Sequence, residues 1–551
     1  MDLSLTAGPL LLRAMNKTEI RLGSVMVAIM MHAGTFAQWS NDPAAPMPVC
    51  NAANAQRNLV AIADADSGYY AIWSDLRNNV DRAQLFGQHF DSEGNALWTA
   101  NGQLLWDQPG RSVNQPSALL MPDGSLMIAF VTGSTIYQGD TTRAMRLNTD
   151  GEPLWPQAAV LTSNNTYQNP RLVASGNCAY LMAYCYNCNG GGGGYRAQRF
   201  DMDGTIQFDL PGTLVGFGGS GAFEVHPDGA DGILTVVRGS NGAGTPLRAF
   251  RYDSLGVAVW AGGVTLSDAS GLQYGFSSSM DDQGALTTVW EVGGIDLRMN
   301  RIDTVGEPLW MPAVQVACDQ PNSQVNIDGL VHDGACYVSW MDNQSDSIGL
   351  YVQRYDLATG EPQWISSGVP AILESVYQPT SRLVASDSGA VIAIMDMSGP
   401  SRYAAMRVRA DGTLAWSEVA SFATSFGPSN GERVELPDGN GGAVSFWRGA
   451  DENLYGARLF RTGKLYNDVG IRETVNRRSI TAFPNPAQER VSFGLPDGEQ
   501  FVTVELINML GRTTTVEGDG RSISIAALSN GSYTARIRTP DSVFVARILK
   551  N

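Results

Sequence analysis

Short runs of alternating apolar and polar residues fill most of the chain, and Gly, Asp, Asn and Pro separate them. In one stretch, the runs Ser117–Met121 and Ser125–Phe130 are joined by Pro-Asp-Gly at 122–124. A period of two predicts half-buried β-strands, and Asp and Gly between two runs predict a tight turn. We therefore expect an all-β chain of short strands joined by hairpins.

One hairpin recurs along the chain in the form Arg, apolar, Asp or Asn, two residues, Gly, three residues and Trp. Two copies are Arg146–Trp155 and Arg301–Trp310. Asp or Asn bonds the backbone two residues further on, and Gly accepts the positive φ that such turns need. Because an indole buries a large apolar area and its N–H needs a partner, we expect this Trp, on the second strand of the hairpin, to pack between neighbouring units.

The aromatic residue that ends the hairpin recurs roughly every 50 residues, and two further strand-like runs precede each hairpin. The predicted packing residues are Trp39, Trp98, Trp155, Phe208, Trp260, Trp310, Trp364 and Trp416. Four strands in about 50 residues are typical of a β-propeller blade. We predict an eight-bladed propeller over residues 38–466, with seven blades as the alternative, and expect the strand around Trp39 to complete the last blade.

The two ends of the chain differ from the repeats. Residues 1–37 resemble an export signal, with an apolar run at 25–31 and small residues before a cleavage point after Ala37. Met15 begins a complete signal by itself, so residues 1–14 read as an over-called start. Residues 467–478 form a linker, and the alternating runs of 479–551 predict a small Ig-like β-sandwich.

This last segment resembles the C-terminal sorting domain of the type IX secretion system of Bacteroidota. The matching residues are Pro484, Asn485, Pro486, Gly511, Gly531, Tyr533 and Lys550. The resemblance implies passage to the outer cell surface or beyond it, with the secretion machinery as a partner. The apolar run at 25–31 is too short to span a bilayer stably, so we expect no transmembrane segment in the mature chain.

The hairpins resemble the Trp-docking motif of eight-bladed quinoprotein dehydrogenases, and the best copy is 356–364. In that family the motif ties blades together and does not bind the quinone. The sequence has no adjacent Cys pair and no metal-ligand constellation of the kind those enzymes use. We therefore predict no quinone or other cofactor, with calcium kept as a candidate ligand.

Composition and charge narrow the partners. The net charge is −17, which argues against nucleic acid, since a polyanion needs a basic surface. Six Cys are too few for a disulfide scaffold. In an exported protein we expect a local disulfide between Cys185 and Cys188, or a pairing with Cys178, and Cys318 is a candidate partner of Cys336.

Two sets of residues are candidate ligand sites. Arg recurs in seven of eight units, as Arg146, Arg199, Arg251, Arg301, Arg354, Arg407 and Arg458, and His89 takes its place in the first. An arginine ring is a candidate anion site, but repetition favours ion pairs that hold each unit together, with Asp75, Glu291 and Asp342 as expected partners. The spaced carboxylates of 64–68 and 201–204 are candidate calcium ligands, although both stretches lie where turns are expected.

We expect a secreted or cell-surface binding or adhesion module whose ligand, an extracellular glycan or protein, meets loops that vary between units. These loops are Asp75–Asp81, Thr132–Thr142, Asn187–Tyr195 and Asn343–Ile348. His, the usual base beside a Ser or Cys nucleophile, occurs only at 32, 89, 226 and 332, and no catalytic residue is predicted. The alternatives are a glycoside-active or quinone-dependent enzyme, which should place ionisable groups with perturbed pKa values in the central channel, and a structural surface component. A binding module should expose aromatic residues on a loop face.

Overall fold

The protein, seen as a computed structural model, consists of strands gathered in two compact parts. The structure describes residues 38–135, 139–163, 167–185, 193–217, 222–238, 246–267, 275–318, 320–342, 349–373, 380–397, 402–423, 428–465, 478–496, 500–501, 503–508, 513–539 and 543–551. One compact part extends to Tyr466 and the other begins at Asn467. Each regular element of the described residues is a β-strand, which confirms the predicted all-β class.

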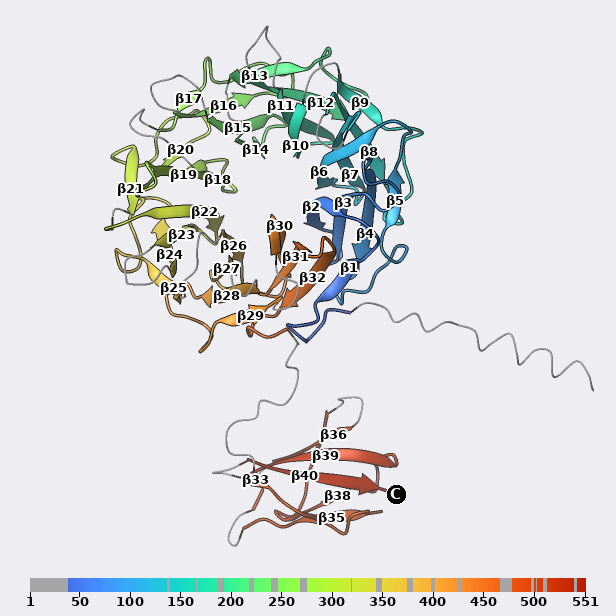
Figure 1. Ribbon diagram of the computed structural model, residues 1–551. Coiled ribbons are helices and arrows are strands. Elements are labelled where there is room, and N and C mark those ends of the chain that lie inside the picture. The colour runs from blue at the N-terminus through green and yellow to red at the C-terminus, as the bar shows by residue number, and fades with distance from the viewer. Residues whose placement is uncertain are drawn as a thin grey trace, which may run out of the picture. The chain divides into compact units, whose positions relative to one another are not determined.

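Within its described residues, the first part contains eight four-stranded antiparallel sheets, which we number 1 to 8 along the chain (Figure 1). From the innermost strand outward, sheets 1 to 4 are β2 (Gln56–Ala63), β3 (Tyr69–Asp75), β4 (Gln84–Phe90), β5 (Gln103–Trp106); β6 (Ser112–Leu120), β7 (Leu126–Gly133), β8 (Thr141–Leu147), β9 (Ala159–Ser163); β10 (Tyr167–Ser175), β11 (Cys178–Cys185), β12 (Gly194–Asp201), β13 (Thr213–Phe217); and β14 (Phe223–Pro227), β15 (Ile233–Arg238), β16 (Leu247–Tyr252), β17 (Val264–Thr265).

Sheets 5 to 8 have the same order. They are β18 (Phe276–Met280), β19 (Leu286–Val292), β20 (Asp296–Ile302), β21 (Val314–Cys318); β22 (Gln324–His332), β23 (Ala335–Asp342), β24 (Gly349–Asp356), β25 (Val369–Leu373); β26 (Ser381–Ala385), β27 (Val391–Met397), β28 (Arg402–Val408), β29 (Ala420–Phe422); and β30 (Pro428–Pro437), β31 (Ala443–Gly449), β32 (Leu454–Leu459), β1 (Met47–Cys50). The outermost strand of sheet 8 therefore comes from the start of the chain.

The sheets form a closed, propeller-like ring around a central opening (Figure 1). The innermost strands β2, β6, β10, β14, β18, β22, β26 and β30 each contact the next, and β30 contacts β2. The apolar cores lie between successive sheets, as where Tyr70 and Ile72 of sheet 1 pack with Leu126 and Ile128 of sheet 2. The side chains of one face of each strand are thereby buried against the neighbouring sheet.

The N-terminal strand β1 closes the ring by pairing with β32, with Met47 opposite Gly456. This closure was predicted, but the strand begins at Met47, after Trp39, and not around it. The closing contact is antiparallel, and it covers the edge that β32 would otherwise expose to solvent.

The docking Trp residues lie in a different place from the one expected. We predicted them on the second strand of the hairpin, but Trp98 lies in the bend between β4 and β5. Its Nε1 donates a hydrogen bond to the Thr149 carbonyl of sheet 2 at 2.9 Å. A Cβ on the turn residue Gly151 would lie 3.0 Å from this indole, so the ring rests directly on the glycine.

The same contact recurs around the ring. Indole Nε1 groups donate to a turn carbonyl of the following sheet at Trp39, Trp98, Trp155, Trp310, Trp364 and Trp416. Phe208 lies against Gly256, and Trp260 lies against Gly306. The Nε1 of Trp260 is buried without a hydrogen-bond partner, so this interface lacks one bond that its equivalents make.

The second part consists of two sheets that share one core. The larger has the order β33 (Arg478–Ser479), β40 (Val543–Lys550), β39 (Gly531–Arg538), β36 (Thr503–Asn508), β37 (Thr513–Val516), and the smaller has β34 (Ala482–Phe483), β35 (Arg490–Phe493), β38 (Ser522–Ser524). Val491 and Ile523 of the smaller sheet and Leu506 and Ile537 of the larger are fully or almost fully buried in this core. The Ig-like topology stays a prediction.

Candidate functional site

The repeated arginines are engaged in contacts that hold the ring together. Arg251 donates through Nε to Asp228 in the first turn of its own sheet at 3.0 Å, and through a terminal nitrogen to the Thr304 carbonyl of the next sheet at 2.5 Å. His89, which replaces Arg in sheet 1, makes the same pair of contacts, with Asp64 at 2.8 Å and the Thr149 carbonyl at 3.2 Å.

The other repeated arginines behave alike. Arg146, Arg301, Arg407 and Arg458 pair with the first-turn residues Asp123, Asp281, Asp387 and Asp438, and Arg199 and Arg354 bond Ser175 and Tyr337. The expected carboxylate partners were therefore wrong: Asp75 pairs with Arg77, Glu291 accepts from the Asn326 backbone N–H, and Asp342 accepts from the Trp340 indole. The carboxylates of the first turn are the partners because they lie beside the end of the third strand, which carries the repeated arginine.

The two candidate calcium loops are turns whose carboxylates bond the backbone. Asp64 accepts hydrogen bonds from the N–H groups of Asp66 and Gly68, and Asp201 accepts from those of Asp203 and Thr205. Among the described residues, no group of three or more His, Cys, Asp and Glu is placed to hold a metal ion. Calcium binding here stays a prediction.

The cysteines only partly follow the expected pairing. Cys185 is disulfide-bonded, and Cys178 is a free thiol, so these two are not joined. Cys188 lies outside the described residues. Cys336 is also a free, buried thiol, so the expected bond to Cys318 is absent.

The sorting residues lie in the second compact part. The Asn485 side chain accepts from the Leu549 N–H and donates to the Arg547 carbonyl, both at 2.8 Å, which ties the Pro484–Pro486 entry to the last strand. Tyr533 donates to the Ser529 carbonyl at 2.8 Å. Lys550 is 8% exposed, and Gly531 begins β39. Gly511 and the export signal with Ala37 lie outside the described residues.

Among the described residues of the predicted ligand loops, no large aromatic side chain is exposed. Large exposed apolar residues of the described ring are aliphatic, such as Leu255, Val305 and Met311, and they lie near the docking hairpins. Most of 187–195 and all of 343–348 lie outside the described residues. Within the described part of the ring, the central channel is therefore the better candidate for a ligand site.

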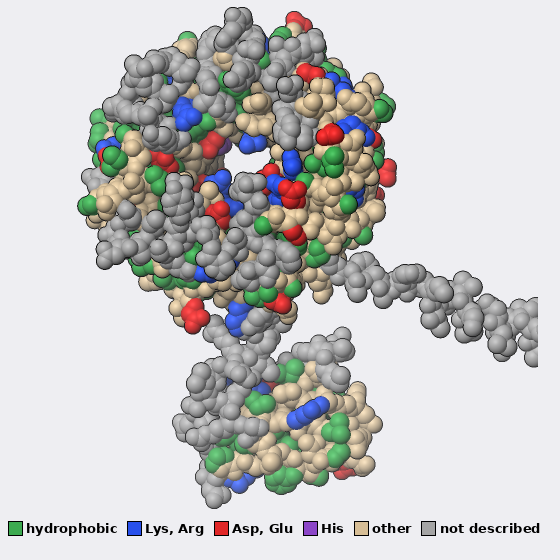
Figure 2. All heavy atoms as spheres, in the orientation of Figure 1, with side chains coloured by type: hydrophobic (Ala, Val, Ile, Leu, Met, Phe, Trp, Pro, Cys, Tyr) green, Lys and Arg blue, Asp and Glu red, His purple; other side chains and the backbone are tan. Residues whose placement is uncertain are grey.

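The innermost strands, which surround the central opening (Figure 1), each carry one residue at an equivalent position. Each of these residues lies four positions before the first turn of its sheet, as Val60 does before Asp64 and Glu224 before Asp228. The set is Val60, Ser117, Arg171, Glu224, Ser277, Asp328, Arg382 and Val434. Sheets 3 to 7 therefore carry Arg, Glu, Ser, Asp and Arg in succession, and Figure 2 shows charged side chains around the opening.

The carboxylates of this group bond the neighbouring strand. Glu224 Oε2 accepts from the Ser278 N–H at 2.6 Å and also from the Ser278 hydroxyl. Asp328 Oδ2 accepts from the Leu383 N–H at 2.7 Å. Each carboxylate thus joins one innermost strand to the next. Asp328 uses both of its oxygens within the ring, since Oδ1 also accepts from the Ser277 hydroxyl at 3.4 Å.

Burial and neighbouring charges shift the pKa values of several of these groups. Burial raises the pKa of Glu224 to about 7, the bonds to Ser278 oppose that rise, and Asp328 and Arg382 also act on it from other sheets. Burial likewise raises the pKa of Asp328, and Arg382 opposes the shift. His226, bonded to the Ser278 hydroxyl at 2.8 Å, has its pKa lowered to about 4 by burial.

Sequence reasoning missed this group because it aligned the units on the Trp. Aligning them on the first turn would have placed four charged residues in a column that elsewhere holds Val and Ser. A charged residue at a position that holds Val in sheets 1 and 8 and Ser in sheets 2 and 5 is the signal that marks them.

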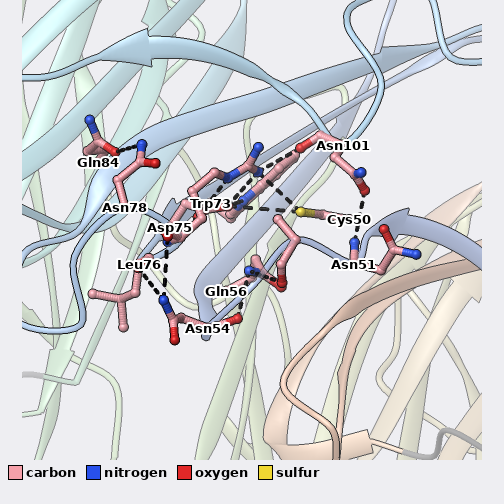
Figure 3. Close-up of polar contacts among 12 residues, drawn as sticks. Cys50, Asn51, Asn54, Gln56, Trp73, Asp75, Leu76, Asn78, Gln84 and Asn101 are labelled. Atoms are coloured by element: carbon pink, nitrogen blue, oxygen red, sulfur yellow. Dashed lines mark hydrogen bonds and ion pairs between the residues drawn. The ribbon is translucent and has the colours of Figure 1, made fainter.

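The junction of sheets 8 and 1 has its own polar network (Figure 3). Asp75 is fully buried and accepts from the Trp73 indole and from Arg77, both at 2.7 Å. Arg77 also donates to the Cys50 thiol at 3.2 Å and to the Asn101 carbonyl at 2.7 Å. Because Cys50 belongs to β1, the network ties the closing strand to the first sheet.

A pocket of about 590 Å³ lies at the turns of sheets 5 and 6, and Asp281, Asp333 and Asp356 are among its lining residues. Asp281 pairs with Arg301 and accepts two backbone N–H groups, and Asp356 accepts those of Ala358 and Thr359. At least two of these carboxylates thus serve the turns themselves.

Within the described residues, no helix is long and apolar enough to cross a membrane. The family model described as the secretion system C-terminal sorting domain matches residues 481–551. This match confirms the sorting domain and places the protein among those exported by type IX secretion to the cell surface or the extracellular space. No curated protein matches the chain.

Solved structures similar to the chain include propeller-like proteins of several kinds. A protein of unknown function from Dyadobacter fermentans has 11% identity and a TM-score of 0.33 and covers 65% of this chain and 95% of its own. An ulvan lyase of polysaccharide lyase family PL25 has 10% and 0.41, with 79% and 96% covered. The WD40 domain of Toxoplasma gondii coronin has 12% and 0.36, with 74% and 87% covered.

Proposed function

We propose that the chain is an exported, eight-bladed β-propeller that binds an extracellular ligand in its central channel. Export rests on the sorting domain. The blade number is supported by eight four-stranded sheets within the described residues and by the closed circuit of innermost strands. The Trp contacts between successive sheets support a docking role like the one that the resemblance to quinoprotein propellers implies.

The binding proposal rests on the difference between two sets of polar residues: the repeated arginines and the residues at the equivalent position of the innermost strands. The repeated arginines, which recur in almost every sheet, are bonded within the scaffold. The residues at the equivalent position differ from sheet to sheet, and Arg171 and Arg382 among them are exposed. A ligand site needs such asymmetry, because a group repeated in every sheet serves the fold.

The test is a glycan-array and small-anion screen of the mature secreted protein, followed by titration of any hit. Binding that is lost when the channel charges are neutralised, with the fold intact, supports the proposal. A mature protein that binds no glycan, anion or protein of its own extracellular surroundings under these conditions would contradict it and favour a structural surface component.

An extracellular enzyme on the same scaffold is the second candidate. A carboxyl group whose pKa is raised to about 7 meets one requirement of a general acid, and Glu224 has this property. Glu224 also accepts a backbone hydrogen bond from Ser278 and so has a structural role. This role explains the buried carboxylate without catalysis and favours a binding module over an enzyme. Turnover of a bound saccharide that disappears in Glu224→Gln, with binding retained, would reverse the order of the two.

A further inference from the structure

Arg171 and Arg382 differ from the repeated arginines because their charges are not neutralised by contact. Neither guanidinium forms an ion pair with a described carboxylate, and within the described residues each makes a single hydrogen bond, to the carbonyl of its preceding residue: Pro170 at 3.4 Å and Ser381 at 3.1 Å. A guanidinium carries five N–H donors in a fixed fork. Most donors of both groups are therefore open to a ligand.

The surroundings of Arg171 are those of a channel rather than of an open surface. Its side chain is exposed to solvent, yet burial by the surrounding protein lowers its pKa, while Glu224 opposes that shift. Charges in a narrow, protein-walled space attract counter-ions more strongly than charges on a convex surface do.

The ring places the two arginines opposite each other. Arg171 belongs to sheet 3 and Arg382 to sheet 7, so three sheets separate them on either side of the closed circuit. The intervening sheets 4, 5 and 6 carry Glu224, Ser277 and Asp328. Ser277 is buried and donates to Asp328 at 3.4 Å, so the arc formed by sheets 3 to 7 offers a ligand the carboxylates of Glu224 and Asp328 between two exposed guanidinium groups.

The arc also offers acceptors for hydroxyl groups. The bonds from Ser278 reach Glu224 through Oε2 alone, so Oε1 keeps its lone pairs for another donor. A ligand with acid groups toward the arginines and hydroxyl groups toward the carboxylates would match the whole arc. Acid groups separated by several hydroxyl groups are typical of an acidic saccharide.

We propose that Arg171 and Arg382 form the two ends of a binding site in the central channel for an acidic saccharide whose carboxylate or sulfate groups they clamp. This inference rests on the proposed binding function and names its ligand class. Bidentate pairing with a planar oxyanion is the geometry that arginine supports best.

The test measures binding of three saccharide probes of equal length by calorimetric titration of the mature protein. One probe carries uronate carboxylates, one carries sulfate esters, and one is neutral. The variants are Arg171→Gln and Arg382→Gln, with Arg409→Gln as control, since Arg409 lies on an exposed turn of sheet 7 and bonds Thr413, Leu414 and Ala415. The control removes the same charge without touching the channel.

We expect each channel variant to weaken binding of an acidic probe about ten-fold or more, as loss of a charge-assisted bond does, and the control to change it little. The two acidic probes then show whether carboxylate or sulfate is preferred. Binding that both channel variants leave intact overturns the arginine clamp while the binding function stands. Equal tightness for the neutral probe, or for a dicarboxylate without hydroxyl groups, overturns the acidic saccharide, and binding to no probe or other ligand overturns both proposals.

Discussion

The contact between a Trp and the turn glycine of the next sheet gives a direct test of how the ring is held together. Gly151 has φ +78°, and a Cβ there would meet the Trp98 ring at 3.0 Å. Gly124, in the first turn of the same sheet, has φ +81°, and a Cβ there would meet nothing within 4 Å. The two glycines therefore share a backbone conformation and differ in what a methyl group would strike.

Gly124→Ala should cost about 1 kcal/mol, because an L-residue is strained in the left-handed region. Gly151→Ala should cost this amount and a further 1 to 3 kcal/mol, roughly, because the indole cannot move away without disturbing the neighbouring sheet. The difference between the two variants isolates the docking contact.

The measurement is urea denaturation of the full mature protein, followed by Trp fluorescence and by circular dichroism. The shift of the midpoint, multiplied by the common slope, gives the loss of stability. Equal losses in the two variants would show that the indole does not rest on the turn and would refute the docking argument. A larger loss for Gly124→Ala would refute it as well.

Three further predictions concern the same molecule. Trp310→Phe should lose about 1 kcal/mol more stability than Trp260→Phe by thermal denaturation, because only the first indole has a hydrogen-bond partner; equal losses would contradict this. Burial raises the pKa of Glu224 from 4.5 to about 7, so the folded protein loses stability as the pH rises through that window. The Glu224→Gln variant should therefore be as stable as the parent at pH 4 and more stable above pH 7, by at most about 3 kcal/mol. A stability difference that does not change with pH would exclude the buried carboxylate as its cause. Deleting 479–551 should retain the protein in the periplasm of the native host, detected by fractionation, and unchanged secretion would contradict the sorting role.

Most of the ring was predictable because its signals are repeated. Each hairpin carries its own turn Asp and Gly, so an error in one copy is corrected by the others. The bend that holds the Trp was not predictable from alternation, since Trp98 follows a single bridging residue after the turn and not a full strand.

The channel group was not predictable from the same signals, because it is the part that does not repeat. The residues Arg171, Glu224 and Arg382 are far apart in sequence, and only the closed ring places their innermost strands around one opening. The partners of the repeated arginines were misassigned for a related reason. Asp228, in the first turn of its sheet, accepts a hydrogen bond from Arg251 on the third strand. Hydrophobic periodicity does not reveal which carboxylate lies nearest to an arginine in the folded sheet.

The strand β1 also sets the order in which the molecule can be completed. Among the described strands of the ring, β1 comes first along the chain and its partner β32 comes last. Until synthesis passes Leu459, a growing or truncated chain carries two unpaired ends, either of which is a template for association with another copy. A finished chain joins its own two ends, so correct self-recognition depends on the whole ring being present before neighbours arrive.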